Sequence, residues 1–279
     1  MDVLILAGGL SHERDVSIRS GRRVAEALRD AGVDAEVRDV DSGLIPLLRS
    51  LGDEPVWPLL HGASGEDGSL QDVLEMVGVR YVGSSPRSAR VAWSKPVAKT
   101  MVRRAGLATP DYVTLPHSLF RELGAEHVLD AVVDRLGLPL VVKPARGGSA
   151  LGVTTVTDRG ELPRAMVDCF AYGDVALIEK RVDGTEVAVS VIGTGDDAYA
   201  LPGVEIATDG NYDFDARYNA GRVEYFARAR LDDKVAAAVA DAALRTHRLL
   251  GLTGLSRTDT IVDADGTPQV LDVNVSPGL

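Results

Sequence analysis

The sequence predicts a mixed α/β protein in which a parallel sheet comes first and a more strand-rich part follows. In the first third, short apolar strands alternate with a helical segment, a pattern typical of a parallel sheet with helices on its faces. Near the C-terminus, two apolar strands flank the turn at residues 263–266, which indicates a hairpin. The length of 279 residues fits two or three compact units, so we expect more than one domain.

The first third contains two conspicuous loops, residues 8–17 and 61–68, each of which follows a predicted strand. Ligands bind at the carboxyl ends of the strands in open parallel sheets. We therefore expect both loops to line a site. The predicted elements of this region are a strand at residues 3–7, a helix at 20–31 with its apolar residues on one face, and strands at 34–40 and 56–60.

The rest of the chain alternates between strands and helices and is interrupted by a polar segment at residues 207–222, rich in Asp, Gly and Asn. The predicted elements are helices at 92–105 and 128–136, strands at 140–143, 153–156, 175–180, 186–192 and 200–204, a helix at 235–250, and strands at 258–262 and 269–273.

Composition limits the possible partners. The net charge is −11, so the chain as a whole has no electrostatic reason to bind nucleic acid or an anionic membrane. No apolar run approaches the roughly 18 residues of a membrane span, and no targeting segment is visible. The one cysteine, Cys169, lies in an apolar stretch and is expected in the core. Without a disulfide framework, the chain suits a reducing cytosol, and we expect a cytoplasmic protein.

The glycine-rich stretch at residues 146–152 lies between two predicted strands, where backbone N–H groups can converge on an anion. Lys143 ends the strand before it, and Lys95 lies upstream, so both lysines are candidate phosphate ligands. The spacing is neither that of a P-loop nor of a GxGxxG fingerprint, which argues against a Rossmann dehydrogenase. An ordinary hairpin loop and a solvated helical lysine remain open alternatives.

An acidic pair lies on the predicted C-terminal hairpin. Asp259 and Asp272 are on consecutive strands, and Asn274 shares a strand face with Asp272 because it is two residues away. Oxygen ligands from paired strands suit Mg²⁺, with phosphates and waters completing the octahedron. Arg257 shares the face of Asp259, so the group is either a plain ion pair or a metal site with a cation beside it.

Seven segments follow one another along the chain: residues 8–17, 61–68, 143–152, 178–186, 212–218, 256–259 and 272–278. In this order they resemble the corresponding segments of the D-alanine–D-alanine ligase family of ATP-grasp enzymes. The resemblance extends over nearly the whole chain, and the shared order makes it specific. It implies a Rossmann-like parallel-sheet domain at residues 1–88 and an α+β ATP-grasp fold in two subdomains at 89–181 and 182–279, with the family normally continuing past Leu279.

The resemblance also implies a role for each matching residue. Three residues, Asp259, Asp272 and Asn274, would hold two Mg²⁺ ions, for which Mn²⁺ can substitute. Glu13 would take the ammonium group of the first D-alanine. The catalytic group would be Glu13, Ser149, Tyr218, Arg257 and the N–H of Gly278, with His61 beside the first D-alanine. The ATP ligands would be Lys95, Lys143, Gly147, Gly148, Ser149, Glu179, Lys180, Val182, Glu186 and Arg217.

The implied reaction begins with phosphorylation of one D-alanine by ATP to an acyl phosphate, which the amine of a second D-alanine attacks. Water would destroy the acyl phosphate, so a lid must exclude it, and residues 207–222 are the candidate. The product would be D-alanyl-D-alanine for peptidoglycan precursors, and the family implies a homodimer.

The chain departs from the family at several positions. Asp272 replaces the usual Glu and is one methylene shorter, Arg217 replaces Lys, and Ala150 replaces a common second serine. Groups that bind the second substrate's carboxylate normally lie beyond Leu279. Two alternatives therefore stay open: a ligase that joins D-alanine to D-serine or D-lactate, and a nucleotide-binding protein with little ligase activity. Tyr218 argues against the lactate version, because Phe accompanies ester formation in the family.

Overall fold

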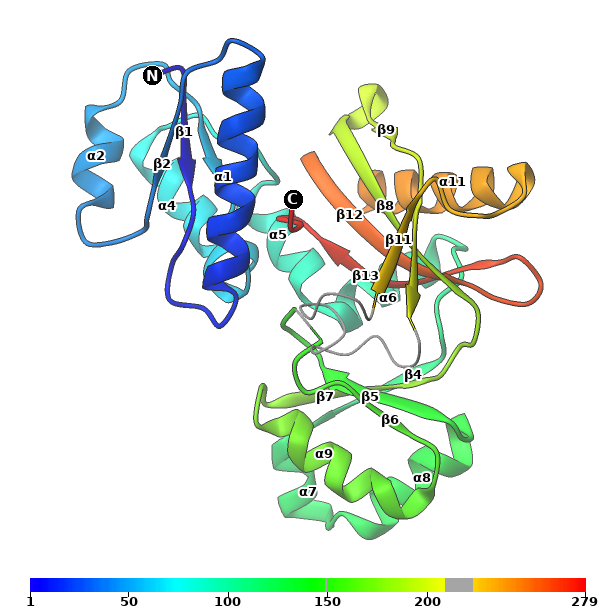
Figure 1. Cartoon of the computed structure of the whole chain (residues 1–279). Helices are drawn as coiled ribbons and strands as arrows, with labels where there is room; N and C mark the ends of the chain where they lie inside the picture. The colour runs from blue at the N-terminus through cyan, green and yellow to red at the C-terminus, as the bar shows by residue number, and fades with distance from the viewer. Residues whose placement is uncertain (149, 209–222) are drawn as a thin grey trace.

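The computed structural model describes residues 1–148, 150–208 and 223–279 (Figure 1). Along the chain, a parallel-sheet unit is followed by a central unit and then by a C-terminal unit, the last two built on antiparallel sheets. The C-terminus returns to lie next to the first unit (Figure 1). This arrangement confirms the predicted mixed α/β class.

The first unit is a parallel sheet covered by helices on both faces. Its elements are β1 (Val3–Leu6), α1 (Arg14–Asp30), β2 (Ala35–Arg38), α2 (Leu44–Ser50), β3 (Val56–Pro58), α3 (Ala63–Glu66) and α4 (Ser69–Val77). The strand order is β2-β1-β3. Alternation along β1 turns Leu4 and Leu6 toward α2 and α4 and turns Ile5 toward α1. The carboxyl ends of β1 and β3 therefore lie together, and the loops after them meet there.

The central unit is an antiparallel sheet with helices on one face. Its elements are β4 (Tyr112–Pro116), α7 (His117–Leu123), α8 (Glu126–Leu136), β5 (Leu140–Pro144), β6 (Thr154–Val156), α9 (Leu162–Phe170) and β7 (Val175–Lys180). Leu140, Val142 and Ile178 pack against these helices. Because side chains alternate along a strand, Lys143 and Glu179 lie on the opposite face of the sheet.

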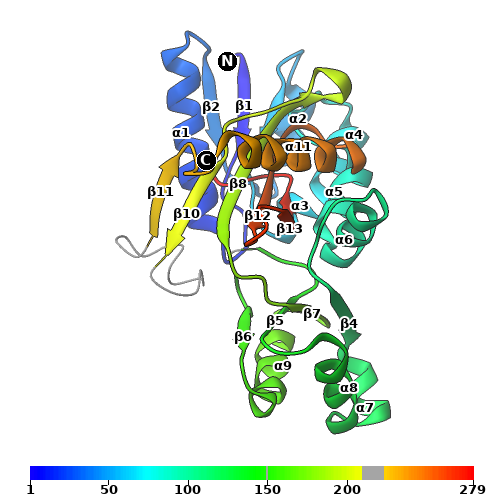
Figure 2. The ribbon, with the colours of Figure 1, turned by 90° about the vertical axis from the view of Figure 1, so that its right-hand side faces the viewer.

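The C-terminal unit is a larger antiparallel sheet ordered β11-β10-β8-β12-β13. Its elements are β8 (Thr185–Thr194), β9 (Tyr199–Ala200), β10 (Val204–Thr208), β11 (Val223–Ala227), α11 (Asp233–Leu249), β12 (Thr253–Val262) and β13 (Pro268–Asn274). Val187, Val189 and Val191 of β8 pack against α11. Glu186, on the opposite face of β8, lines the cavity that this sheet forms with the central unit. Figure 2 shows the central unit below the C-terminal sheet.

The helices α5 (Pro86–Trp93) and α6 (Lys95–Arg104) connect the first unit to the rest. Chain order places most of them in the central subdomain. Their buried residues, among them Ala89, Ala98 and Val102, pack instead against Val270 and Val273 of β13. Packing against the C-terminal sheet therefore positions α6, and with it Lys95, at the edge of the central sheet.

Two expected loops are partly helical. The helix predicted at residues 20–31 begins earlier, at Arg14, so α1 takes up the second half of the loop at 8–17. Ser17 explains the early start, because its hydroxyl accepts from Gly8 N at 2.8 Å and donates to Leu59 O at 2.6 Å. These bonds fix the helix to the sheet where the apolar pattern is weak. The loop at 61–68 likewise contains the short helix α3.

Two predicted elements are interrupted at proline. The helix expected at residues 92–105 is divided at Ser94, because Pro96 lacks an N–H and its ring would clash with a preceding helical carbonyl. The strand expected at 200–204 is divided between β9 and β10, and Pro202 lies in the gap. Other elements that were not predicted include α2, α4, α7, α9, β4, β11 and most of α5.

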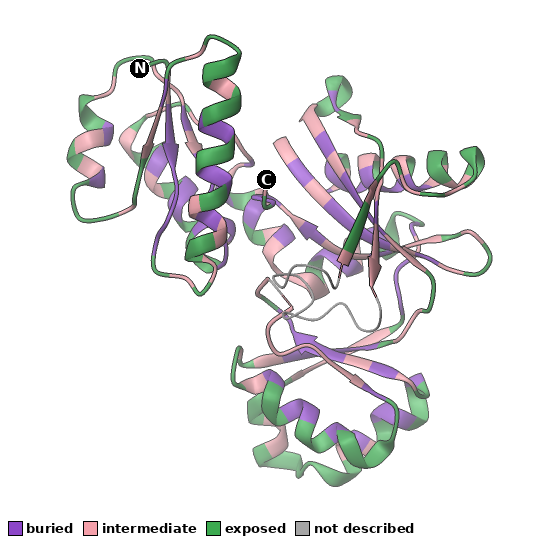
Figure 3. Cartoon of the chain, viewed as in Figure 1, coloured by how far each residue is buried: buried purple, intermediate pink, exposed green. Residues whose placement is uncertain are grey.

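Burial follows the layers, with buried residues along the sheets and exposed residues on the outer helix faces (Figure 3). Cys169 is fully buried in α9, as predicted, and burial raises the pKa of its thiol to about 12. Within the described ranges, no helix has the length and apolar character needed to cross a membrane.

Candidate active site

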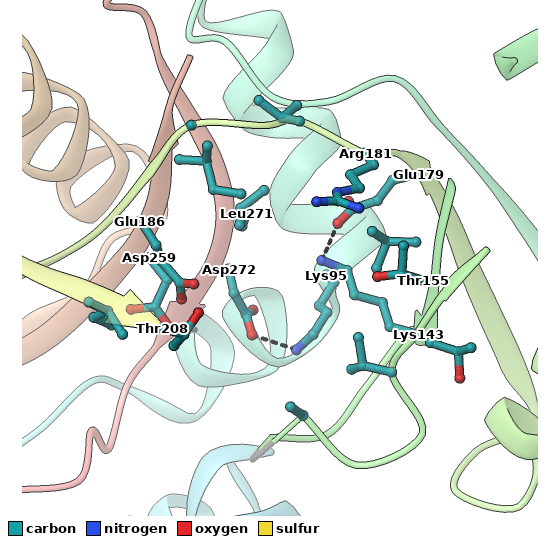
Figure 4. A pocket seen from close by; sticks show the side chains of 18 of the residues that line it. Lys95, Lys143, Thr155, Glu179, Arg181, Glu186, Thr208, Asp259, Leu271 and Asp272 are labelled. Atoms are coloured by element: carbon teal, nitrogen blue, oxygen red, sulfur yellow. Dashed lines mark ion pairs between the residues drawn. The ribbon is translucent and has the colours of Figure 1, made fainter. Parts of the chain in front are cut away.

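A cavity of about 680 Å³ lies between the central sheet and the C-terminal sheet (Figure 4). It brings together residues predicted from segments far apart in the sequence. Of the predicted nucleotide ligands, those that line it are Lys95, Lys143, Gly147, Gly148, Glu179, Lys180, Val182 and Glu186. All three predicted metal ligands, Asp259, Asp272 and Asn274, also line it. Ser149 and Arg217 lie outside the described residues.

Lys95 reaches into the cavity from the first turn of α6. Its Nζ lies 2.7 Å from Asp272 Oδ2 and donates to Gly147 O at 2.7 Å (Figure 4). The interrupted helix is what places it there, because Pro96 starts a new helix at Lys95. Lys95 thus links the C-terminal hairpin to the glycine-rich loop.

Lys143 enters the cavity from the central sheet and pairs with a buried carboxylate. Its Nζ lies 2.5 Å from Glu179 Oε1, while Lys99 Nζ lies 3.0 Å from Glu179 Oε2. All three side chains are nine-tenths or more buried. Burial alone would raise the pKa of Glu179, but the two lysines outweigh it and lower that pKa below its ordinary value. Burial also lowers the pKa of Lys99, to about 8.

The C-terminal hairpin pairs the two predicted acids directly. Asp259 lies opposite Asp272, and Arg257 lies opposite Asn274. Arg257 donates to both oxygens of Asp259, at 2.6 and 2.8 Å, and Asn274 Nδ2 donates to Asp259 Oδ2 at 3.2 Å. Arg257 is therefore ion-paired with Asp259, and both carboxylates of the hairpin line the cavity. Among the described residues, no cluster of three or more His, Cys, Asp or Glu forms a metal site.

The loops of the first unit approach the glycine-rich loop at a second cavity. Glu13, the residue before α1, comes so close that a Cβ at Gly148 would lie 3.2 Å from its Oε1. A second cavity of about 700 Å³ lies there, and Glu13 and Gly148 both line it. Glu13 therefore faces the glycine-rich loop.

His61 ties the end of the chain to the first unit. Its Nδ1 lies 2.8 Å from Ser276 O, which makes Nδ1 the protonated nitrogen, and Nε2 lies 3.3 Å from Ser20 Oγ. Ser20 Oγ in turn accepts from Leu279 N at 3.0 Å. Gly278 thereby lies beside α1, with a Cβ built on it 3.6 Å from Val16. Burial lowers the pKa of His61, so the ring is neutral near pH 7.

Known proteins that match this chain over nearly its whole length belong to the family that the sequence resembles. A sequence profile described as "D-ala D-ala ligase C-terminus" matches residues 101–279, more than half of the chain. A D-alanine–D-alanine ligase from Bordetella petrii is 41% identical over 276 residues, covering 99% of this chain and 82% of that protein. The chain belongs to the D-alanine–D-alanine ligase family.

Other family members support the same assignment. The D-alanine–D-alanine ligase of Anaeromyxobacter dehalogenans is 40% identical over 278 residues, covering 99% of this chain and 87% of that protein. The crystal structure of the VanG D-Ala:D-Ser ligase from Enterococcus faecalis aligns with a TM-score of 0.85 at 27% identity, covering 99% of this chain and 90% of that one. A Bacillus anthracis D-alanine–D-alanine ligase complexed with ATP aligns at 0.79 and 28% identity, covering 99% and 86%.

Two buried residues of this ligase-family chain were not assigned from the sequence. Glu66, in α3, accepts from Gly62 N at 3.0 Å, and burial followed by the charge of Glu13 raises its pKa to about 8. Lys99 lies behind Glu179. The four-residue spacing from Lys95 was a usable signal, because residues four apart share a helix face. Nothing in the sequence marked Glu66 as buried, since it lies among polar residues in a predicted loop.

Proposed function

We propose that the chain joins two D-alanines at the expense of ATP and releases D-alanyl-D-alanine, a peptidoglycan precursor. The observation that carries this proposal is the single cavity between two sheets, where Lys95 and Lys143 meet the acids of the C-terminal hairpin. Lysines and acids around one pocket suit a nucleotide whose phosphates need both cations and a metal. The names of relatives near 40% identity supply the substrate pair.

The residues around the cavity fit Mg²⁺. Asp259, Asp272 and Asn274 offer oxygen donors on adjacent strands, the ligand type that Mg²⁺ prefers. Bound there, the ion would offset negative charge on the phosphates of ATP. Lys95 is paired with Asp272 in this structure. With Mg²⁺ bound to that carboxylate, Lys95 would be released and would turn to a phosphate of ATP. Two ions, or Mn²⁺ in their place, remain part of the proposal.

The amino-acid end of the site is proposed to lie across the glycine-rich loop from the nucleotide. Glu13 would accept the ammonium group of the first D-alanine, and neutral His61 would lie beside it. Arg257 and the N–H of Gly278 would stabilise the oxyanion that forms when the second amine attacks. Ser149 and Tyr218, which the resemblance adds to this group, lie outside the described residues.

D-alanine is proposed as the second substrate because the relatives near 40% identity are named for it. The D-Ala:D-Ser ligase is a structural neighbour at 27% identity, which makes D-serine the alternative to test. We further propose a cytoplasmic homodimer, on the family resemblance, and sedimentation of the purified chain tests the dimer.

The deciding experiment measures ADP release from ATP and identifies the product by mass spectrometry. D-alanine alone should support turnover and yield D-alanyl-D-alanine, while L-alanine should not. D-serine or D-lactate added with D-alanine should give little mixed product. ADP release that does not depend on any amino acid would overturn the ligase proposal, and a predominance of D-alanyl-D-serine would overturn the choice of second substrate.

A further inference from the structure

Two buried lysines flank the Glu179 carboxylate from opposite sides. Lys143 Nζ is 2.5 Å from Oε1 and lines the nucleotide cavity with Glu179. Lys99 Nζ is 3.0 Å from Oε2, and its side chain is 2% exposed. Lys99 is not part of the described cavity lining, so it lies behind the carboxylate while Lys143 lies in front. One carboxylate therefore has a cation on the nucleotide side and another on the protein side.

Lys99 is fixed in this position by neutral groups. Its Nζ donates to Thr109 Oγ1 at 2.6 Å and lies 3.5 Å from Val270 O. Thr109 Oγ1 also donates to Val270 O at 2.7 Å. The ammonium group is thus tied to β13 and β7 together, and it cannot follow a ligand into the cavity.

The arrangement has an excess of positive charge that burial makes costly. A single lysine suffices to neutralise a single buried carboxylate, and a second buried ammonium carries its own desolvation cost. The second cation becomes useful only if the first is shared with something else. Lys143, which faces the cavity, would share its charge with the phosphates of ATP.

We propose that Lys99 is a positioning residue for nucleotide binding that acts through Glu179. When Lys143 turns its charge to the ATP phosphates, Lys99 keeps the Glu179 carboxylate neutralised and in place. This inference rests on the proposed function, because it takes Lys143 as a phosphate ligand. Lys95 and Asp272 form a comparable pair on the other side of the cavity. There a metal ion would replace the lysine, whereas at Glu179 the replacement cation is Lys99, which belongs to the protein.

Without Lys99, Lys143 is the sole remaining counter-ion of Glu179 among the described residues. Binding of phosphate would then leave a buried carboxylate short of charge, or Lys143 would stay with Glu179 and bind phosphate poorly. Either way, affinity for the phosphates decreases, while affinity for the adenosine moiety does not change. If Lys99 only fastened α6 to the sheets, its loss would weaken binding of adenosine and of ATP alike.

The test measures the dissociation constants of ATP, with Mg²⁺ and without amino acid, and of adenosine, by calorimetry. Lys99→Met should weaken ATP about tenfold or more and change adenosine by less than about threefold. Lys234→Met is the matched control, because Lys234 is an exposed lysine of α11, and it should leave both constants unchanged. Circular dichroism verifies that each variant is folded.

The double variant Lys99→Met/Glu179→Gln separates the charge from the scaffold. It removes the carboxylate together with its rear cation, so Lys143 is released to the phosphates, and ATP should bind more tightly than in Lys99→Met. If Lys99→Met does not fold, Lys99→Gln replaces it, and the comparison is made with Lys99→Gln/Glu179→Gln.

Equal losses for ATP and adenosine in Lys99→Met, or a double variant that binds ATP no better than Lys99→Met, would overturn the inference. A double variant whose ATP affinity falls far more than its adenosine affinity, relative to the wild type, would overturn it as well. Failure of the wild type itself to bind ATP would instead refute the proposed function.

Discussion

Glu66 and Glu179 are both buried glutamates near the same site, yet their protonation differs. Glu179 lies between two lysines on the nucleotide side, and they lower its pKa below the ordinary value despite its burial. Glu66 lies on the side proposed to bind the amino acid. Among the described residues it pairs with no basic side chain, and burial raises its pKa to about 8. Partners, more than burial, decide the charge of each carboxylate.

The difference extends to the regions around them. The nucleotide side is built from opposite charges already in contact, namely Lys95 with Asp272 and Lys143 with Glu179. The amino-acid side holds a neutral His61 and a protonated Glu66 near pH 7. A charged ligand must therefore displace existing ion pairs on one side, and on the other it meets neutral groups with Glu13 beside them. Each prediction below tests one side against the other.

The largest effect is expected from Glu179→Gln. It leaves two buried lysines without their carboxylate, and breaking a buried ion pair costs about 3–5 kcal/mol. Urea unfolding at pH 6 should show a loss of that order. The matched variant Glu66→Gln replaces a neutral acid by a neutral amide and should cost less than about 1 kcal/mol. Equal losses for the two variants would remove the distinction between the regions.

Glu13→Gln should raise the KM for D-alanine by about 100-fold, because a lost charge pair with a bound ammonium costs a few kcal/mol. The dissociation constant of ATP should stay within about twofold, since Glu13 lines the cavity on the other side of the glycine-rich loop. Steady-state kinetics and calorimetry give the two numbers. A collapse of nucleotide affinity in this variant would place Glu13 on the wrong side of the loop.

The stability of the chain should depend on pH through Glu66. Its folded pKa is raised from 4.5 to about 8, so the folded state holds a proton that the unfolded state has lost in this window. This contribution to stability is complete below pH 4.5 and is lost as pH rises to about 8. Melting temperatures measured across the window should fall less with pH in Glu66→Gln than in the wild type. Parallel profiles for the two proteins would show that Glu66 is ionised when folded.

The smallest effect is expected at the C-terminal hairpin that carries the proposed metal ligands. Asp272→Glu lengthens the arm that faces Lys95 and should let one carboxylate reach two ions. The Mg²⁺ concentration at half-maximal activity should fall by a few-fold. A titration of activity with Mg²⁺ measures it, and Asp265→Glu, at an exposed residue in the turn of the same hairpin, serves as the control. An unchanged or higher midpoint would count against a bridging role for residue 272.

Much of the nucleotide side could be predicted because its signals are local in sequence. Lys143 adjoins the glycine-rich loop, and Asp259 and Asp272 lie on the two strands of one hairpin, whose pairing brings them opposite each other. The seven ordered segments of the family resemblance placed Glu13 and His61. Periodicity failed where proline interrupts an element, at Pro96 and at Pro202.

The buried partners could not be predicted, because burial arises from packing between distant segments. Lys99 and Glu179 are far apart in sequence, and no sequence pattern indicates that their side chains are in contact. Glu66 lies among polar residues, where a polar loop and a buried turn look alike. The direction of a pKa shift depends on such partners, so it becomes visible only in three dimensions.

The most direct test is a ¹³C NMR titration of the glutamate carboxyl carbons from pH 5 to 9, with Glu66→Gln and Glu179→Gln used for assignment. Glu66 should titrate with a midpoint near 8, while Glu179 should stay ionised throughout, because its pKa is lowered from 4.5. A Glu66 that is already ionised at pH 6, or a Glu179 that titrates within this range, would contradict the account of two buried carboxylates set apart by their partners.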